Sequence, residues 1–252
     1  MDDLSLLLLH IEWGADEALE DAPLDRLRPP QAAPTLLAPR PVPARPAPPL
    51  GTPPLGTPVE RAARVADEAL SLEALRAAIA GFDGCALRDM ATHLVFAAGD
   101  PDAGTLLIGG APGADEDRAG IPFAGAEGAL LDQMLASVGL KRGAMLLTQA
   151  IPWRPPGGRV PTPNEIQLCR PFLLRLIALT LPRRIVLFGA LAANIVLGAA
   201  PRARRIGWIE APLEGGAAQA LLLPALGDVL KNPARRKDSW AGMRALRRVL
   251  DG

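Results

Sequence analysis

The sequence predicts an α/β protein of three layers, α/β/α, built on a central four-stranded parallel sheet. Four short apolar runs recur between residues 105 and 225, and segments with helical apolar spacing separate them. Each run is almost continuously apolar rather than alternating between apolar and polar residues. Continuous apolar strands that alternate with helices are typical of a parallel sheet covered on both faces.

Residues 1–27 are predicted to hold a short amphipathic helix, because four apolar side chains recur at helical spacing. These are Leu4, Leu7, Leu8 and Ile11. The apolar stripe either docks on the chain's own domain or binds a partner protein. Residues 28–58 are dense in proline, which removes amide donors and fixes φ, so we predict a linker without regular structure. Residues 59–252 are predicted to form the folded domain.

The folded domain is predicted to open with one or two helices over residues 59–82, with Ser71 as an N-cap. The elements after them are a strand at 105–110, a helix at 126–140, a strand at 144–150, a helix at 162–181 opened by Thr162 and Pro163, a strand at 184–189, a helix at 190–198, a strand at 219–225 and a helix at 233–250. Ligands of parallel sheets bind beyond the carboxyl ends of the strands. The loops 109–125, 149–161 and 223–232 are therefore the predicted location of the site.

Charge and cysteine content restrict the class of protein. The net charge is zero, but residues 154–252 carry 16 basic and 6 acidic side chains, which suits either a phosphate-backbone partner or a solvated arginine surface. Two distant cysteines, Cys85 and Cys169, exclude a disulfide framework. No stretch approaches the roughly 20 apolar residues of a membrane span, and the acidic start is unlike a secretory signal. We expect a cytoplasmic protein, and because no oligomer signal is visible, a monomer.

The first two loops carry specific motifs, GGAPGADEDRAGIPFAGAEG over residues 109–128 and QAIPWRPPGGRVPTPNEIQLC over residues 149–169. In order, spacing and identity, they resemble the family 4 uracil-DNA glycosylases. The resemblance runs from about Phe82 to Gly198 and continues more weakly to the end. A dinucleotide-binding interpretation of the first loop is weaker, because the loop lacks GxGxxG spacing.

The resemblance implies base flipping, in which a uridine swings out of the duplex into a pocket beyond the sheet. Cleavage of the N-glycosidic bond then requires an aromatic face under the base, donors to its carbonyl edge and a group near the sugar for water. Phe123 matches the family's stacking phenylalanine, and four residues match the first loop: Pro112, Gly113, Glu116 and Asp117. The base-binding positions implied are Gly110, Ala111, Phe123 and Gln149.

Three positions depart from the family pattern. Gly110 stands where the family has a glutamate near the reacting water, and Gln149 where it has an asparagine that binds uracil. Leu223 stands where the family has a histidine that donates to the departing uracil. Losing one donor aimed at developing negative charge costs about 2.7–4 kcal/mol of transition-state stabilisation. These departures imply that hydrolysis is impaired.

Asp115 and Glu116 are the remaining candidates for polarising water. The alternative is that this acidic run opens a helix, where negative charge is favourable. The chain's two histidines, His10 and His93, fall outside the three loops, and we interpret His93 as structural.

The resemblance also implies a four-iron cluster held by four cysteines, and this sequence departs from that pattern too. Cys85 and Cys169 match the second and fourth ligands, whereas Phe82 and Trp153 replace the first and third. Two thiolates do not complete such a site. We therefore predict no cofactor and a ligand region filled by apolar packing, which avoids a destabilising void.

Basic residues near the second and third loops are the predicted DNA contacts. They are Arg154, Arg159, Lys231, Arg235 and Arg236. The alternative is that they cap helix ends or stay solvated. The third loop, PALGDVLKNP, is longer than the family's loop and carries Asp228, so the strand-separating wedge of the family is not predicted with its usual geometry.

Three functions remain open at this point. The first is an active, divergent glycosylase that uses Asp115, Glu116 or backbone donors. The second is a DNA-binding or partner-binding relative that recognises a flipped base without cleaving it. The third is a structural relative that no longer binds DNA, because function depends on the site rather than on the fold.

Overall fold

The computed structural model describes residues 56–198, 207–213 and 216–251, all within the unit Pro53–Gly252. The helix predicted within residues 1–27 lies outside the described residues, as does the linker up to residue 55. Helix α2 already begins at Pro58, the last residue assigned to the linker. No helix of the described part is both long and apolar enough to cross a membrane.

A six-stranded sheet forms the centre, in the order β1-β3-β2-β4-β6-β5. The strands are β1 (Ala98–Gly99), β2 (Thr105–Gly109), β3 (Leu146–Gln149), β4 (Arg184–Phe188), β5 (Trp208–Leu213) and β6 (Gly216–Leu223). The four inner strands are parallel and confirm the predicted fold class. At the two edges, β1 and β5 pair antiparallel, and neither was predicted.

The strand register separates two apolar faces. One face carries the row Leu147, Leu107, Val186 and Leu221, and the other carries Leu146, Leu106, Ile185 and Ala220. All eight residues are buried. Each row belongs to a different apolar cluster, so the sheet is buried on both sides, as its continuous apolar strands predict.

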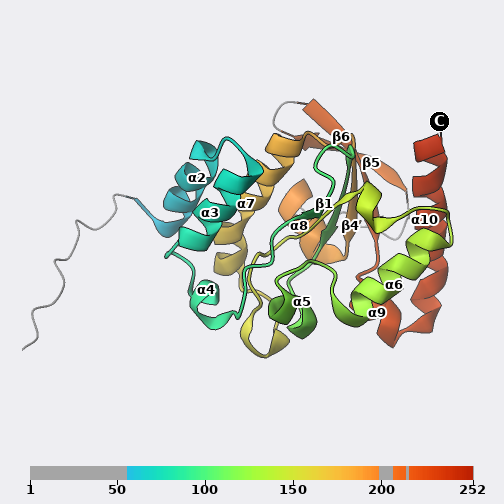
Figure 1. The fold of residues 1–252 in the computed structure, drawn as a ribbon, viewed down its shortest axis with the longest axis horizontal. Coiled ribbons are helices and arrows are strands. Elements are labelled where there is room, and N and C mark those ends of the chain that lie inside the picture. Colours follow the sequence, from blue (N-terminus) through green and yellow to red (C-terminus); the bar gives the residue numbers. More distant parts are fainter. Residues whose placement is uncertain (1–55, 199–206, 214–215, 252) are drawn as a thin grey trace, which may run out of the picture. The chain divides into compact units, whose positions relative to one another are not determined.

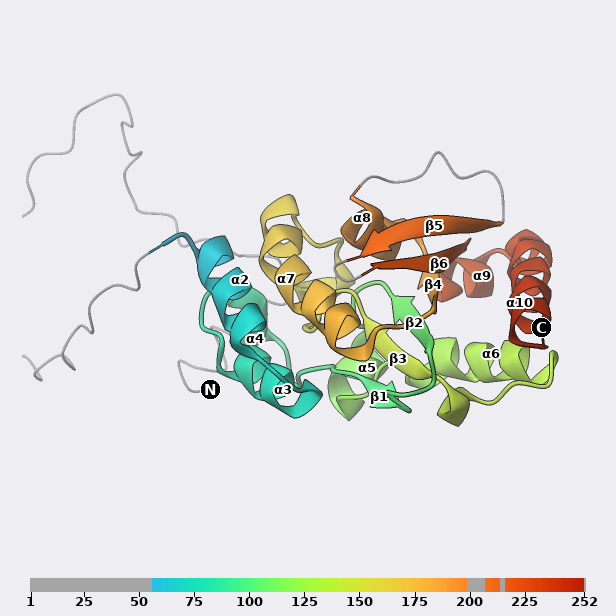
Figure 2. The same ribbon diagram turned by 90° about the horizontal axis from the view of Figure 1, so that it is seen from above.

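Helices cover both faces of the sheet (Figures 1 and 2). The first cluster is completed by α2 (Pro58–Glu68), α3 (Leu72–Gly81), α7 (Pro163–Thr180) and α8 (Ala190–Leu197), with α2 and α3 packed on α7. The second is completed by α6 (Gly125–Ala136), α9 (Leu226–Lys231) and α10 (Arg236–Asp251). The short elements are α4 (Ala86–Met90), α5 (Ala114–Ala119), η1 (Arg142–Ala144), η2 (Pro156–Gly158) and η3 (Pro233–Arg235).

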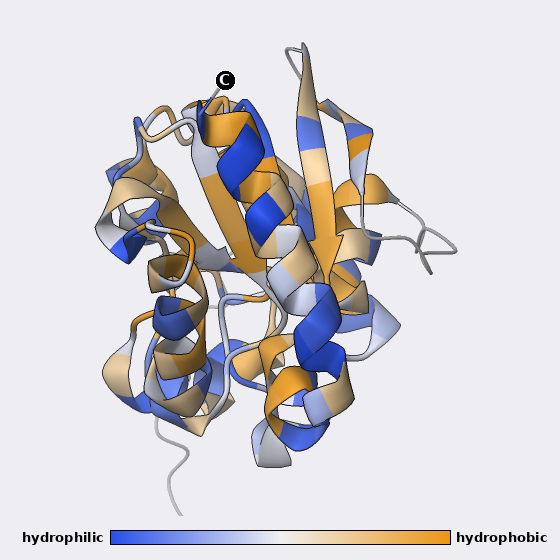
Figure 3. Ribbon diagram, turned by 90° about the vertical axis from the view of Figure 1, so that its right-hand side faces the viewer, coloured by the Kyte–Doolittle hydropathy of each residue, from blue (hydrophilic) through white to orange (hydrophobic). Residues whose placement is uncertain are grey.

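Helix ends follow the capping signals in the sequence. The Ser71 side chain accepts a hydrogen bond from the Ala74 N–H, which confirms it as the N-cap of α3. Helix α7 opens with Pro163 behind Thr162, which forms a capping box with Glu165. On α10, polar residues face outward while the strands behind it are apolar (Figure 3).

Candidate functional site

The loops that follow the parallel strands meet at one edge of the sheet. Strand β2 lies between β3 and β4, so consecutive connections leave it in opposite directions, and a crevice is expected at this switch point. A Cβ added at Gly110 would lie 3.8 Å from Leu191 Cδ2, and one added at Gly189 would lie 2.9 Å from Ala225 Cβ. The segments after β2, β4 and β6 are therefore in close contact here.

Glu116 is the central polar residue of this edge. It is buried, with 4% of its surface exposed, and its carboxylate accepts the Gly113 and Phe123 N–H groups at 2.6 Å each. Oε1 also accepts a hydrogen bond from Gln149 Nε2. Burial raises the pKa of Glu116, and these donors offset the rise only in part. Both oxygens of this predicted catalytic residue therefore bind protein N–H groups and link the first loop to the end of β3.

The neighbouring acids have structural partners. Asp115, Glu116 and Asp117 lie in the first turn of α5, so the acidic run does open a helix, where negative charge is favourable. Asp115 is exposed and pairs with Arg118 at 3.0 Å.

Asp117 accepts hydrogen bonds from Thr92 and His93, and His93 Nδ1 lies 2.9 Å from the Asp117 carbonyl oxygen. Burial alone would raise the pKa of Asp117, but the hydrogen bonds from Thr92 and His93 outweigh it and hold the pKa below its usual range. These contacts agree with a structural role for His93.

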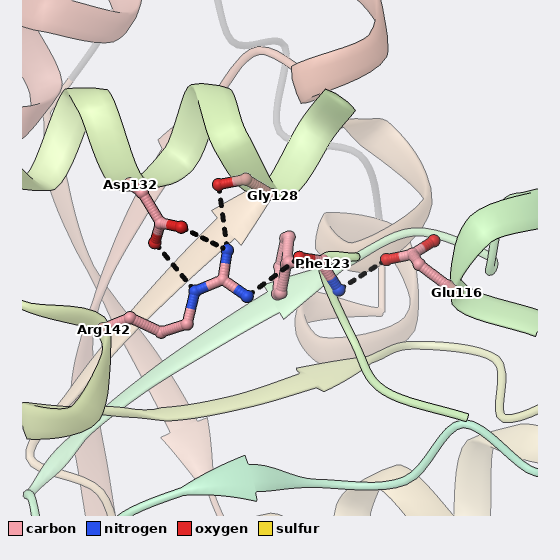
Figure 4. A network of polar contacts seen from close by, with 5 residues as sticks. All are labelled: Glu116, Phe123, Gly128, Asp132 and Arg142. Atoms are coloured by element: carbon pink, nitrogen blue, oxygen red, sulfur yellow. Dashed lines mark hydrogen bonds and ion pairs between the residues drawn. The ribbon is translucent and has the colours of Figure 1, made fainter. Parts of the chain in front are cut away.

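Phe123 occupies a left-handed backbone conformation, with φ at 54°. Its N–H donates to Glu116 and its carbonyl accepts from Arg142, as Figure 4 shows. The ring packs edge-on against Phe188, with centroids 5.7 Å apart. Only 1% of Phe123 is exposed, so the ring is a fixed part of the second apolar cluster.

Gln149 lies next to this assembly and is buried. Its Nε2 donates to Glu116, whereas its Oε1 is buried without a hydrogen-bond partner among the described residues. A Cβ at Gly109 would collide with Oε1, so a side chain at position 109 would displace this amide from its present position. Gln149 also lines a cavity of about 20 Å³ together with Thr148 and Cys169, enough for one water molecule.

Leu223 ends β6 and is buried against α10. A Cβ added at Gly242 would lie 3.2 Å from Leu223 Cγ and closer still to Cδ2. The Leu223 carbonyl accepts the Gly189 N–H at 2.8 Å. The side chain at this predicted catalytic position is therefore directed into the second apolar cluster.

The predicted metal-ligand region is filled by side chains. Phe82 and Trp153 are buried, and Phe82 packs edge-on against Phe172 with centroids 5.3 Å apart. The buried thiols of Cys85 and Cys169 share a hydrogen bond, which lowers the pKa of Cys85 to about 7 and raises that of Cys169. Among the described residues, no group of three or more His, Cys, Asp or Glu side chains is arranged to hold a metal ion. The donor set does not fit a cluster that needs four thiolates.

The five predicted DNA contacts fall into three kinds. The two terminal guanidinium nitrogens of Arg159, Nη1 and Nη2, donate to the Glu165 carboxylate at 2.8 and 2.6 Å, and the pKa of Glu165 falls to about 2 as a result. Arg154 is partly buried, and its Nε has no partner among the described residues. The remaining three, Lys231, Arg235 and Arg236, are exposed and form no ion pair with any described residue.

Sequence reasoning missed two further residues of this edge. Arg142 donates a hydrogen bond to the Phe123 carbonyl. Every residue has a backbone carbonyl, so the sequence does not reveal which one an arginine binds. Glu127 lies in the first turn of α6, where burial raises the pKa of its carboxyl, with the charge of Glu116 acting in the same direction. A Cβ at Gly227 would lie 2.8 Å from Glu127 Oε1, so this carboxyl faces the segment after β6.

The sequence of the chain is similar to that of known proteins. The sequence profile of the Uracil DNA glycosylase superfamily matches residues 96–244, more than half of the chain. The type-4 uracil-DNA glycosylase of Pyrobaculum aerophilum is 36% identical over 128 residues, which cover 51% of this chain and 65% of that protein. The type-4 enzyme of Archaeoglobus fulgidus is 41% identical over 112 residues, covering 44% and 56%. The chain thus spans less than two thirds of the length of either relative.

Proposed function

Because the chain belongs to the uracil DNA glycosylase superfamily, we propose that it binds a uracil flipped out of DNA and hydrolyses the N-glycosidic bond only slowly. The observation that carries this proposal is the shared bond to Glu116. Its Oε1 accepts both the Phe123 N–H and the Gln149 amide, so an aromatic residue and a polar side chain are held together at the strand ends.

The unpaired Gln149 Oε1 supports uracil as the base. A buried acceptor without a partner is unfavourable, and a ligand that supplies an N–H removes this penalty. Uracil carries a hydrogen on N3, whereas N3 of cytosine is itself an acceptor. A site that hydrogen-bonds one group discriminates strongly against an analogue lacking it. We therefore expect uracil to be preferred over cytosine.

Slow hydrolysis follows from the same residues. Negative charge develops on the departing uracil, and each missing donor costs about 2.7–4 kcal/mol. Leu223 offers no donor and Gly110 no carboxylate. The Glu116 oxygens are bound to three protein N–H groups, which leaves this carboxylate poorly placed to activate water.

The second candidate is a relative that binds a flipped base without cleaving it. The burial of Leu223 against Gly242 favours it, because no side chain then replaces the missing donor at the end of β6. In both cases Lys231, Arg235 and Arg236 are proposed to contact phosphates. In both cases the ligand region is proposed to function without an iron–sulfur cluster, since Phe82 and Trp153 fill it.

The test uses the full chain and a uracil-containing oligonucleotide, scored for binding and for abasic product, beside the same oligonucleotide with cytosine. We expect tighter binding to uracil DNA, and product at a rate far below that of a type-4 enzyme assayed in parallel. Gln149→Ala should abolish the preference, whereas Gln133→Ala, at an exposed glutamine of α6, should retain it. Binding without product would favour the second candidate. Equal binding of both oligonucleotides would contradict the proposal.

A further inference from the structure

The backbone of Phe123 is in an unfavourable conformation for a residue with a side chain. Only two non-glycine residues of the described part have positive φ, Phe123 at 54° and Leu181 at 42°. Leu181 is the C-cap of α7, where a left-handed residue is common. Phe123 does not lie at the C-cap of a helix. A residue strained in this way persists only where surrounding contacts hold it.

Two side chains hold Phe123 from opposite sides (Figure 4). Glu116 accepts its N–H at 2.6 Å, and Arg142 Nη1 donates to its carbonyl at 2.9 Å. Rotation about φ changes the direction of the N–H relative to the side chain, and rotation about ψ changes that of the carbonyl. The two bonds together therefore fix the conformation and, through it, the position of the ring.

Arg142 is itself held in place by three further bonds. Its Nε and Nη2 donate to the Asp132 carboxylate at 2.8 and 3.2 Å, and Nη2 also donates to the Gly128 carbonyl at 2.9 Å. A Cβ at Gly128 would collide with the Phe123 carbonyl oxygen, so α6 approaches this loop as closely as glycine allows. A lysine has no planar fork and can satisfy only part of this set of acceptors.

We propose that Arg142 is a positioning residue for base binding, which acts by holding the Phe123 peptide, and with it the buried Phe123 ring, in one position at the strand ends beside Gln149. This inference rests on the proposed function. Arg142 follows α6 and precedes β3, so it joins the segment leading to Gln149 to the loop that carries Phe123. It needs no contact with the base.

A double-mutant cycle tests the proposal with uracil DNA. Arg142→Lys should weaken binding about tenfold in the otherwise unchanged chain, which corresponds to one well-placed contact. In a Phe123→Ala background the same substitution should have less than about a twofold effect, because the ring through which it acts is absent. The control is Arg247→Lys, which alters an arginine paired with Asp251 on α10 and should leave binding unchanged. Equal weakening in both backgrounds would overturn the proposal.

Amide hydrogen exchange tests the same inference without DNA. The Phe123 N–H should exchange slowly, and Arg142→Lys should accelerate it about tenfold at unchanged global stability. Unchanged exchange in the variant would overturn the role of Arg142 even if DNA binding were abolished. An unaltered chain with a protected Phe123 amide but no preference for uracil would contradict the proposed function. It would still support the hydrogen bonds that hold the Phe123 peptide. The two failures are therefore distinguishable.

Discussion

Leu223 at the end of β6 packs directly onto Gly242 of α10. A Cβ at Gly242 would lie 3.2 Å from Leu223 Cγ and would collide with Cδ2. Leucine and glycine therefore complement each other in size across the second apolar cluster. The end of β6 is joined to the last helix by packing, at the position where the family pattern has a polar side chain.

Gly242→Ala is expected to lower the free energy of unfolding by about 1–2 kcal/mol. The added methyl group crowds Leu223, and crowding costs typically 1–3 kcal/mol, while alanine recovers up to about 1 kcal/mol of helix propensity. Gly81→Ala in α3 is the control, because nothing lies within 4 Å of its added Cβ, and it should be neutral or stabilising. Chemical denaturation measures both. A fully stable Gly242→Ala chain would show that the two residues do not pack as described.

Leu223→His is expected not to restore rapid hydrolysis. A correctly aimed donor would raise the rate by 10²–10³, but the side chain at this position faces Gly242 rather than the crevice. The rate should stay within about tenfold of the unaltered chain. Burying the imidazole without a partner should also cost about 1–3 kcal/mol of stability. The measurements are abasic-product formation and urea denaturation. A hundredfold gain in the rate of abasic-product formation would contradict this expectation and would show that the side chain at position 223 reaches the bound base.

Glu116→Gln is expected to destabilise the fold by about 1–3 kcal/mol, since a carboxamide places an N–H against one of the three donors. Because burial raises the pKa of Glu116 above its ordinary 4.5, the native state binds this proton more tightly than the unfolded chain. The contribution of Glu116 is therefore largest at acid pH and is lost as the pH rises through the native pKa. The stability difference between the two chains, measured from about pH 4 to about pH 7, should shrink. If the stability difference grew with pH instead, the pKa of Glu116 would be lowered in the native state rather than raised.

Phe82→Cys/Trp153→Cys is expected to take up iron on anaerobic reconstitution with iron and sulfide, which the unaltered chain should not do. The double variant restores four cysteines to the region that now holds only the Cys85–Cys169 pair. Each substitution removes a large buried ring at a cost of about 3–5 kcal/mol, so the metal-free variant should be much less stable. Iron content and visible absorption are the readouts. Phe82→Cys alone is the control, and stoichiometric iron in the unaltered chain would contradict the assignment.

Arg159→Gln is expected to leave the salt dependence of DNA binding unchanged, because its guanidinium is held by Glu165. The combined substitution of Lys231, Arg235 and Arg236 by glutamine should weaken binding. Each phosphate that is no longer neutralised should reduce the slope of log affinity against log salt by about 0.9. DNA-binding titrations at several salt concentrations give the slope for each of the two variants and for the unaltered chain. A decrease in slope of about 0.9 for Arg159→Gln would show that DNA displaces Glu165 from this guanidinium.

The inner strands were predictable because their apolar runs are continuous, as in TLLIG of β2. Strand β5 was not, since WIEAPL contains Glu210 and Pro212 and reads as a loop until β6 pairs with it. Proline is tolerated there because β5 is an edge strand. Helix α9 has only six residues, and so short a helix depends on tertiary contacts rather than on its own sequence.

The site, like the sheet, has parts that the sequence predicts and parts that it does not. That Phe123 and Gln149 lie at one edge of the sheet follows from the motifs and the strand order. That Glu116 joins them does not, because one of its partners there is a backbone N–H, which every residue except proline offers. The left-handed conformation of Phe123 was equally unpredictable, since Arg142, which binds its carbonyl, lies 19 positions away in the sequence.

The single oxygen that receives both Phe123 and Gln149 limits how this chain can change. A substitution at position 149 that alters which base is accepted also withdraws a donor from Glu116, and so loosens the neighbouring peptide of Phe123. In the proposed function, stacking on Phe123 and recognition of the base edge by Gln149 therefore depend on the same carboxylate oxygen. Attempts to redirect the chain toward another base should succeed only when position 149 and position 116 are varied together, and libraries that randomise either alone should return mostly weakened binders.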